Sequence, residues 1–489
     1  MTAENVRQAQ VIAPNGVGAI FDVSGESFVV ESTDTWFTQP MSRPEVSSPR
    51  LKRLLRTDRF IAPPAQKSGR FGGATGPALP VLRFPTWLFC GSCRRMVQWK
   101  SSMEGTNPNV VCPDCKVKMS KQKLVPMRWI QVCRAGHLGD VDWVWYTHAG
   151  TATDCRKRDG LRFLQGSAGV IGLASIEIRC DHCGASRSLA GISDKAVAVR
   201  IGLQCVGRHP WEWFDGQSGH TCPEVPLIAS NVYNPEIVTA IEVPSTGGAA
   251  KSVSPLISTH KLFRPTVEAV KVVGFSAASA FVSTLSAATG TTPEEVSSAV
   301  LAQLASDSEG ASAVVDVPAT NEEIAESEWA ALTRTEPFDL EDFVTRSSSL
   351  PRIPSDPALN RLSELIPQIT LVDTLREVRV FRGFRRVSPD SESKYIRADG
   401  RLQNDTPKPT WLPAIEVFGE GVFQRLDDHA IQGWEQNPSV VSRVDALDRR
   451  ARSSFMWDRL HRNVGQSVTP RYVLLHTLGH LLMRRLSFE

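Results

Sequence analysis

The chain has 489 residues, of which 41% are hydrophobic and 22% are charged, a composition typical of folded proteins with a sizeable core. A chain of this length is too long for one ordinary domain, so roughly two to four units are expected. Its formal net charge of only +3 excludes a wholly basic, histone-like nucleic-acid binder, although local basic patches remain compatible with it.

The first residues of the given sequence do not have the pattern expected of a secretion signal. Residues 1–10 are polar and lack the apolar core of a signal peptide. No apolar run reaches the about 18 residues that span a bilayer. We therefore expect a cytoplasmic protein, in which disulfide bonds rarely persist.

The N-terminal segment, 1–85, is expected to be rich in β-structure. The apolar stretches 16–22 and 27–30 predict two short strands separated by a turn. A basic amphipathic stretch at 51–56 predicts a short helix. The Gly- and Pro-rich residues 63–80 predict a loop.

All ten cysteines lie between Cys90 and Cys222, and the second half of the chain has none. In a reducing compartment, cysteine pairs at short spacing indicate metal binding rather than disulfide bonds. The distribution predicts an N-terminal half organised by metal ions and a C-terminal half held by an ordinary hydrophobic core.

The first cysteine group predicts a zinc ribbon over 86–125. Cys90 and Cys93 form one CxxC knuckle, and Cys112 and Cys115 form a second knuckle after a gap of eighteen residues. Each knuckle offers two thiolates from one tight turn, and the hairpin between them can bring four sulfurs around one ion. The alternative is a set of four buried free thiols.

The later cysteines, with histidines, are expected to bind zinc and so stabilise a second domain over 126–225. The natural grouping is a four-cysteine site made of Cys180, Cys183, Cys205 and Cys222. His182 and His220 could each replace one of these thiolates, although exposed neighbours are the simpler interpretation.

A third site is expected to combine cysteine with histidine, because thiolate and imidazole both suit zinc. Its ligands would be Cys133, His137, His148 and Cys155. The alternative is two buried cysteines and two hydrogen-bonded histidines. Four-thiolate sites are closed, whereas catalytic zinc keeps one open position for water, so the first two sites are expected to be structural.

The region 226–360 is predicted to be helical. Thr292 and Thr320 each precede a glutamate by three residues, which is the signature of a helix start. The acidic stretch of small residues between them, 307–318, is expected to be a mobile loop.

The C-terminal segment, 361–489, is predicted to be a mixed α/β domain that follows a proline-containing linker at 347–357. Strand-like segments at 378–384 and 415–423 precede a helix that starts near Tyr472. Together these elements predict an α+β, multi-domain protein whose N-terminal half contains a zinc ribbon.

No motif marks a catalytic centre. The sequence lacks a P-loop, a nucleophile elbow, an HExxH motif and a dinucleotide fingerprint, so we expect a protein that is not an enzyme. His476 and His480 lie one helical turn apart, but Thr477 stands where a metalloprotease needs its general-base glutamate. With Glu416 and Glu420, which share a strand face, these histidines form the alternative function, a metal-dependent nuclease or hydrolase.

The same four residues have simpler explanations. The histidines could lie in the core or at a partner surface, and the glutamates could belong to a structural turn.

Three clusters of basic residues could contact nucleic-acid phosphates and make binding depend on salt. Solvated surface charge is the simpler interpretation of such runs. The cluster beside the ribbon is the best candidate, because a rigid metal knuckle can present it. The clusters are Lys116, Lys118, Lys121 and Lys123; Arg156, Lys157 and Arg158; and Arg382, Arg385 and Arg386.

Segments spread along the chain resemble the DrmB family, which belongs to the DISARM anti-phage defence system of prokaryotes. They are GVGAIFD at 16–22, LRFPTW at 82–87, the CxxGH motif and its aromatic tail at 133–143, WLPAIEVFGEG at 411–421, and YVLLHTLGHLL at 472–482. Together these segments are specific. The last resembles a domain of unknown function shared with the C-terminal regions of some helicases.

The resemblance implies a zinc-binding subunit that partners DrmA, a superfamily-two helicase-like protein, in recognising and restricting phage DNA. ATP hydrolysis would belong to that partner, which fits the absent P-loop. Proteins of the family look longer, with the terminal helix leading into further strands and helices. Two alternatives follow for 361–489: a truncated domain, or a homologue that is short.

Overall fold

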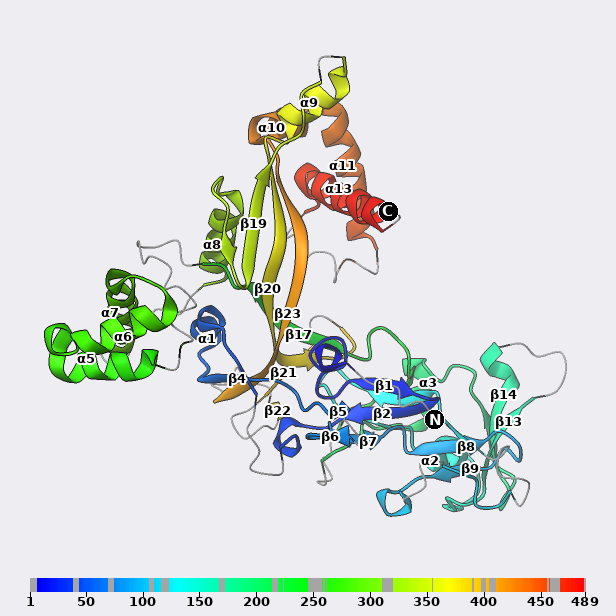
Figure 1. Cartoon of the computed structure of the whole chain (residues 1–489). Coiled ribbons are helices and arrows are strands. Elements are labelled where there is room, and N and C mark those ends of the chain that lie inside the picture. Colours follow the sequence, from blue (N-terminus) through cyan, green and yellow to red (C-terminus); the bar gives the residue numbers. More distant parts are fainter. Residues whose placement is uncertain are drawn as a thin grey trace. The chain divides into compact units, whose positions relative to one another are not determined.

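The chain divides into two compact units, shown in a computed structural model (Figure 1). One unit contains Met1–Glu242 and Thr335–Glu489, and the other is the intervening segment Val243–Arg334. The described residues are 7–37, 44–68, 74–104, 110–115, 123–166, 172–212, 219–222, 224–244, 257, 260, 262–309, 320–353, 355–388, 391–396, 402–403, 410–454, 457 and 467–487.

The two predicted N-terminal strands are confirmed. β1 (Ile20–Val23) and β2 (Glu26–Val30) pair antiparallel. Ser24 and Gly25 between them have φ values of 52° and 79°. Two consecutive positive φ angles are typical of the turn whose twist matches that of paired strands. β7 (Val81–Arg83) extends this sheet along β2.

The predicted basic helix is also confirmed as α1 (Pro49–Leu55). Ser48 caps it, because its hydroxyl accepts a hydrogen bond from the backbone N–H of Leu51 at 3.4 Å. The predicted loop contains the two-residue strands β5 (Lys67–Ser68) and β6 (Ala74–Thr75), which pair with each other.

Three small antiparallel sheets build the cysteine-containing part. Their strands are β8 (Trp87–Cys90), β9 (Met96–Gln98) and β10 (Leu124–Pro126); β13 (Leu161–Gln165), β14 (Ile176–Cys180) and β15 (Ser186–Ser188); and β11 (Trp129–Val132), β12 (Leu138–Asp140) and β16 (Glu224–Pro226). The first two sheets share a core around Trp87 and Trp143 with helices α2 (Trp143–His148) and α3 (Lys195–Ile201). The third packs with β2 around Val29.

A larger sheet joins segments from both ends of the chain. Its strands are β3 (Glu45–Val46), β4 (Arg59–Ile61), β17 (Asn234–Ile241), β18 (Asp339–Leu340), β19 (Phe343–Ser348), β20 (Gln368–Arg385), β21 (Lys394–Ile396), β22 (Leu402–Gln403) and β23 (Trp411–Arg425). β19, β20 and β23 run side by side (Figure 1), and β20 and β23 contain the two predicted strands. β17 pairs with β20 and β4 pairs with β23, so N-terminal residues complete the C-terminal sheet.

The region 226–360 is predicted to be helical, but in the structure both of its ends contain strands. β17 at its start and β18 and β19 near its end belong to the large sheet. A short apolar run does not reveal whether it forms a helix or a strand, because the choice depends on its partner. Here the partner is β20, which lies more than a hundred residues after β17 in sequence.

The helices of the intervening unit are α5 (Phe263–Ala277), α6 (Ser279–Thr289), α7 (Pro293–Glu309) and α8 (Asn321–Thr333). The first three pack around a core that contains the fully buried Leu285. α7 and α8 start where predicted: the hydroxyls of Thr292 and Thr320 accept from the backbone N–H groups of Glu295 and Glu323, at 3.2 and 3.1 Å.

Most of the predicted acidic loop lies outside the described residues, because 307–309 end α7 and 310–319 are not described. Within the described part of the chain, no single helix is long and apolar enough to cross a membrane. The consecutive pair α5 and α6, bent by 117°, meets the same length and composition requirement only when taken together.

Four helices flank the far ends of the long strands. They are α9 (Pro357–Leu365), α10 (Asp428–Glu435), α11 (Pro438–Arg452) and α13 (Pro470–Leu486). α13 begins two residues before Tyr472, which confirms the predicted terminal helix. Arg471 fixes its first turn to α10 by donating to the Glu435 carboxylate at 2.8 Å. The predicted α+β class is therefore confirmed.

Candidate metal centres

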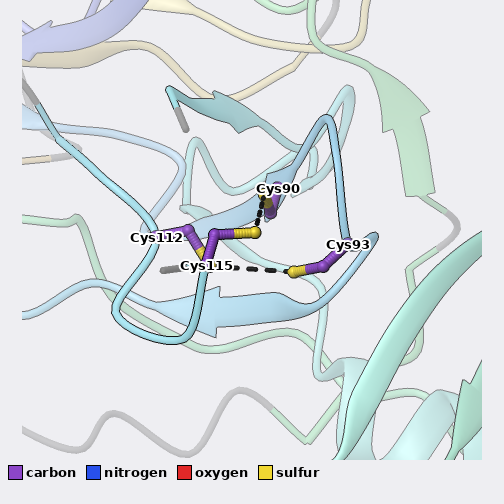
Figure 2. A group of neighbouring side chains, drawn as sticks. All are labelled: Cys90, Cys93, Cys112 and Cys115. Carbon is purple, nitrogen blue, oxygen red and sulfur yellow. Dashed lines mark hydrogen bonds between the residues drawn. The ribbon is translucent and has the colours of Figure 1, made fainter. Parts of the chain in front are cut away.

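The first centre is the predicted ribbon set, Cys90, Cys93, Cys112 and Cys115 (Figure 2). Cys90 ends β8, and the chain turns back there, with the N–H of Arg94 donating to the Cys90 carbonyl at 2.9 Å. Val111 bridges to Lys123, and Leu124 pairs with Cys90. These pairings bring the second knuckle beside the first, so this grouping matches the prediction.

The sulfur separations in the first centre fit a tetrahedral metal site. The Sγ atoms of Cys90 and Cys115 are 3.6 Å apart, and those of Cys93 and Cys112 are 3.8 Å apart. Four sulfurs at about 2.3 Å from a central ion are about 3.8 Å from one another at tetrahedral corners. A disulfide bond would need about 2.05 Å, and all ten cysteines are free. The residues therefore fit a metal ion.

Two thiols of this centre have pKa values that shift in opposite directions. Burial opposes ionisation of Cys90, but the N–H groups of Cys93 and Ser92 outweigh it and lower the pKa of Cys90 to about 7. Hydrogen bonds with Cys93 and Cys90 raise the pKa of Cys115 to about 12. A second thiolate so close to the first is disfavoured, and a bound cation would remove that penalty.

The second centre contains one histidine and three cysteines: His148, Cys155, Cys180 and Cys183. His148 ends α2, and its Nδ1 lies 2.7 Å from the carbonyl oxygen of Val144. A carbonyl can only accept, so Nδ1 carries the proton. Nε2 is buried and has no hydrogen-bond partner within the described residues. Its lone pair is thus free for a metal, in the arrangement usual for histidine ligands.

The cysteines of the second centre come from a sheet and the loop before it. The Sγ atoms of Cys155 and Cys180 are 3.9 Å apart, close to the tetrahedral edge of about 3.8 Å. Cys183 is exposed, and the backbone N–H of Ala185 is the main cause that lowers the pKa of its thiol to about 6. A thiolate is therefore available here near neutral pH.

The third centre gathers Cys133, His137 and Cys205. The sulfurs of Cys133 and Cys205 lie 3.5 and 3.6 Å from Nδ1 of His137. A nitrogen at about 2.05 Å and a sulfur at about 2.3 Å from a tetrahedral ion would be about 3.6 Å apart. Cys222 is buried in the same cluster, and its thiol hydrogen-bonds with that of Cys205.

The predicted grouping of the second and third centres is wrong, because the structure exchanges their members. The prediction joined Cys180 and Cys183 to Cys205 and Cys222, and Cys133 and His137 to His148 and Cys155. Pairing of β13 with β14 instead carries Cys155 to Cys180, and pairing of β11 with β16 carries Cys222 to Cys133. Eleven of the twelve predicted ligands meet at the three centres, and the twelfth, Cys222, is buried beside the third. Strand pairing decides which of them come together.

The two histidines considered as substitute ligands are neighbours of the centres. His182 is exposed, and its Nε2 lies 3.1 Å from the Asp159 carboxylate. The ring of His220 stacks near that of His137, with 6.5 Å between centroids. Neither is among the residues whose ligand atoms meet at a centre.

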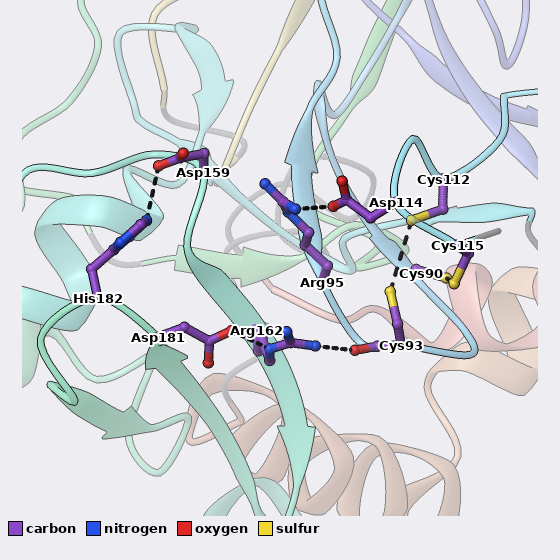
Figure 3. Close-up of polar contacts among 10 residues, drawn as sticks. All are labelled: Cys90, Cys93, Arg95, Cys112, Asp114, Cys115, Asp159, Arg162, Asp181 and His182. Carbon is purple, nitrogen blue, oxygen red and sulfur yellow. Dashed lines mark hydrogen bonds and ion pairs between the residues drawn. The ribbon is translucent and has the colours of Figure 1, made fainter.

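One arginine connects the first two centres (Figure 3). Arg162 on β13 donates to the carbonyl oxygen of Cys93 at 2.7 Å and pairs with Asp181, the residue after Cys180. Arg95, one strand away, forms an isolated β-bridge with Arg162 and an ion pair with Asp114 in the second knuckle. Sequence reasoning missed Arg162, because no local pattern connects residues 69 positions apart.

The basic clusters near the centres are only partly described. Lys116, Lys118 and Lys121 lie outside the described residues. Lys123 donates to the carbonyl oxygen of Ser24 at 2.6 Å. Arg156, Lys157 and Arg158 are exposed and directly follow the ligand Cys155, so this cluster is accessible to a phosphate backbone.

The three arginines of the third basic cluster, a candidate for phosphate contacts, instead contact other residues of the protein. Arg386 is fully buried and donates to three carbonyl oxygens. Arg385 pairs with Glu236, and the guanidinium of Arg382 lies 5.2 Å from the ring centre of Tyr395. Runs of charge in sequence do not reveal that a strand end turns one arginine inwards.

The alternative hydrolase site is not assembled. His476 and His480 are exposed on α13 with ring centroids 4.5 Å apart. Glu416 on β23 pairs with Arg376, and Glu420 on the same strand is exposed. Among the described residues, the three groups that could hold a metal contain none of these histidines or glutamates.

Two comparisons with known proteins cover these centres. A family described as a domain of unknown function (DUF8724) matches residues 7–234, a segment that contains every candidate ligand. The chain is also similar to the "DISARM protein DrmB" of Bacillus paralicheniformis. That relative is 25% identical over 487 residues, which is 96% of this chain and 78% of the relative.

Proposed function

Because the chain belongs to the DrmB family of DISARM proteins, we propose that it is a non-catalytic, zinc-organised subunit that works beside a DrmA-like helicase on phage DNA. The observation that carries this proposal is the set of three ligand groups between Cys90 and Cys222. The first two groups offer four protein ligands each and so leave no open position for water, which suits a metal that supports structure rather than catalysis.

Zinc is the ion that these donors suit best. The ligands are ten thiols and two imidazoles, a donor set typical of zinc. The separations of 3.5–3.9 Å between ligand atoms match tetrahedral zinc bond lengths. Bound zinc would crosslink short strands from different parts of the sequence, and this binding energy would contribute directly to folding.

The helicase partner would supply ATP hydrolysis. The sequence has no P-loop, and the family relationship supports work within a DISARM complex. We place the protein in the cytoplasm, because its clustered free thiols suit a reducing compartment.

The exposed residues Arg156, Lys157 and Arg158 would contribute contacts to DNA phosphates. They follow a ligand of the second centre, so a metal-fixed turn would hold them in place. Arg156 also lies over the indole of Trp145, with 5.5 Å to the ring centre. Contacts of this kind bind without reading sequence and weaken as salt rises.

The first experiment is an affinity purification of the tagged chain from its own host, with bound proteins identified by mass spectrometry. We expect a helicase in stoichiometric amount and about three zinc ions per chain. Recovery of the chain alone would refute the partnership, and less than one zinc per chain would refute the zinc-organised fold.

The DNA contacts are tested by replacing Arg156, Lys157 and Arg158 together with glutamine. The slope of log affinity against log salt should become shallower by about 0.9 for each phosphate that is no longer neutralised. The matched control replaces three exposed arginines of α11 with glutamine, Arg443, Arg449 and Arg450. An equal loss of affinity in both triple variants would show a general effect of charge. It would contradict the proposal that Arg156, Lys157 and Arg158 contact DNA.

A further inference from the structure

The third centre differs from the other two because its ligands are spread over a longer stretch of the chain. Cys133 and His137 flank one tight turn, whereas Cys205 and Cys222 lie about seventy and ninety residues further along the chain. The register of β11 with β16 pairs Ile130 with Val225. Continued outward, it places Cys133 opposite Cys222.

A second backbone pairing completes this cluster. Gln204 bridges to Thr221, and the N–H of Cys205 donates to the carbonyl of His220 at 3.0 Å. Cys205 therefore lies beside the strand that carries Cys222. The two thiols hydrogen-bond, and both are buried with Cys133. Cys222 therefore lies beside the three ligands whose donor atoms already meet.

A buried arginine from the large sheet holds the turn of this centre. Arg386 follows β20 and is 0% exposed. Its Nε donates to the carbonyl of Gly136, within the turn, at 3.0 Å, and its two terminal nitrogens donate to Val232 and Gly18 at 2.9 and 2.7 Å. One guanidinium thus ties the metal turn, the end of the N-terminal half and the first strand region together.

Two more contacts from the same segment reach the turn. The N–H of Glu392 donates to the carbonyl of Arg134 at 3.0 Å. The side chain of Lys394 covers Gly136 so closely that a Cβ there would lie 2.6 Å from it. Arg386, Glu392 and Lys394 therefore contact the turn between Cys133 and His137 from outside, as residues around the ligands of a metal site do.

We propose that Cys133, His137, Cys205 and Cys222 form a four-ligand site for a tetrahedral divalent cation of the zinc class, and that Arg386 is its positioning residue. Metal at this site locks the turn that Arg386 holds, and so couples the cysteine-containing part to the β20 end of the large sheet. The inference rests on the zinc binding in the proposed function but not on the defence role.

The first test compares Cys222→Ser with Cys183→Ser, a ligand change in the second centre. Each variant should lose one of three zinc ions, measured by plasma mass spectrometry. Only Cys222→Ser should speed hydrogen exchange in residues 384–396, on the order of 10-fold, because only the third centre touches that segment. Unchanged zinc in Cys222→Ser, or equal exchange at 384–396 in both variants, overturns the proposal.

A second test acts from the opposite side and leaves every ligand in place. Arg386→Lys removes the guanidinium group that donates to three carbonyl oxygens. One zinc ion should then transfer to a competing chelator about 10-fold to 100-fold more readily. The matched control is Arg385→Lys, the neighbouring arginine that pairs with Glu236. Identical zinc release from both variants would show that Arg386 does not position the site. None of these measurements involves DNA or a helicase, so they stand even if the defence role fails.

Discussion

The carboxylate of Asp140 joins two of the small sheets. It ends β12 and accepts hydrogen bonds from the N–H of Thr86 at 2.9 Å, from the hydroxyl of Thr86 at 2.6 Å, and from the N–H of Trp87 at 3.3 Å. Trp87 begins β8, which ends at the ligand Cys90. Asp140 therefore fixes the strand that leads into the first metal centre to the sheet that carries the third.

Replacing Asp140 with alanine should strongly destabilise this part of the protein. Three hydrogen bonds to a charged acceptor contribute about 1.5–3 kcal/mol each, roughly 4.5–9 kcal/mol in all. Burial opposes the charge, since it raises the pKa of Asp140 despite these bonds. We therefore expect a net loss of about 3–5 kcal/mol in the free energy of unfolding. Asp140→Asn keeps one oxygen for the backbone donors and should cost about 1–2 kcal/mol.

The assay is urea unfolding of zinc-loaded protein, followed by the fluorescence of the buried tryptophans Trp87 and Trp143. The control is Asp159→Ala, which removes an exposed carboxylate that pairs with the exposed His182 and should leave the unfolding midpoint nearly unchanged. A loss below about 1 kcal/mol for Asp140→Ala would refute the argument that this carboxylate joins the sheets.

Four further outcomes are expected. His148→Ala should lose one zinc per chain whereas His182→Ala should keep all of them, and equal metal content would exclude His148 as a ligand. Excess chelator should speed hydrogen exchange across 86–226 but not across 243–334, which holds no predicted ligand; a uniform response would contradict separate units. Zinc should be released as pH falls below about 5, because acid protonates the thiols of Cys183 and Cys90, whose pKa values lie near 6 and 7. Retention of zinc at pH 4 in an equilibrated chelator assay would contradict thiolate ligation. Leu285→Ala should cost about 2–5 kcal/mol in the helical unit and leave the zinc content unchanged, and a loss of zinc would contradict this separation.

The sequence by itself determined features whose causes lie within a few residues. The knuckle pairs Cys90 with Cys93 and Cys180 with Cys183 follow from spacing alone, because one tight turn presents both thiols. The starts of α7 and α8 follow in the same way, since Thr292 and Thr320 cap helices through a glutamate three residues later. The turn between β1 and β2 is another local feature.

Only the tertiary structure decided which ligands share an ion. Cys155 joins Cys180, and Cys133 joins Cys222, because strands far apart in sequence pair with each other. The same dependence on distant partners hid the role of Arg386, which appears in sequence as one of several basic residues. Its three acceptors are carbonyl oxygens from segments up to 368 residues away. Local residue types thus predict which residues can bind a metal. Which of them come together depends on hydrogen bonds between distant strands, and no local pattern contains that information.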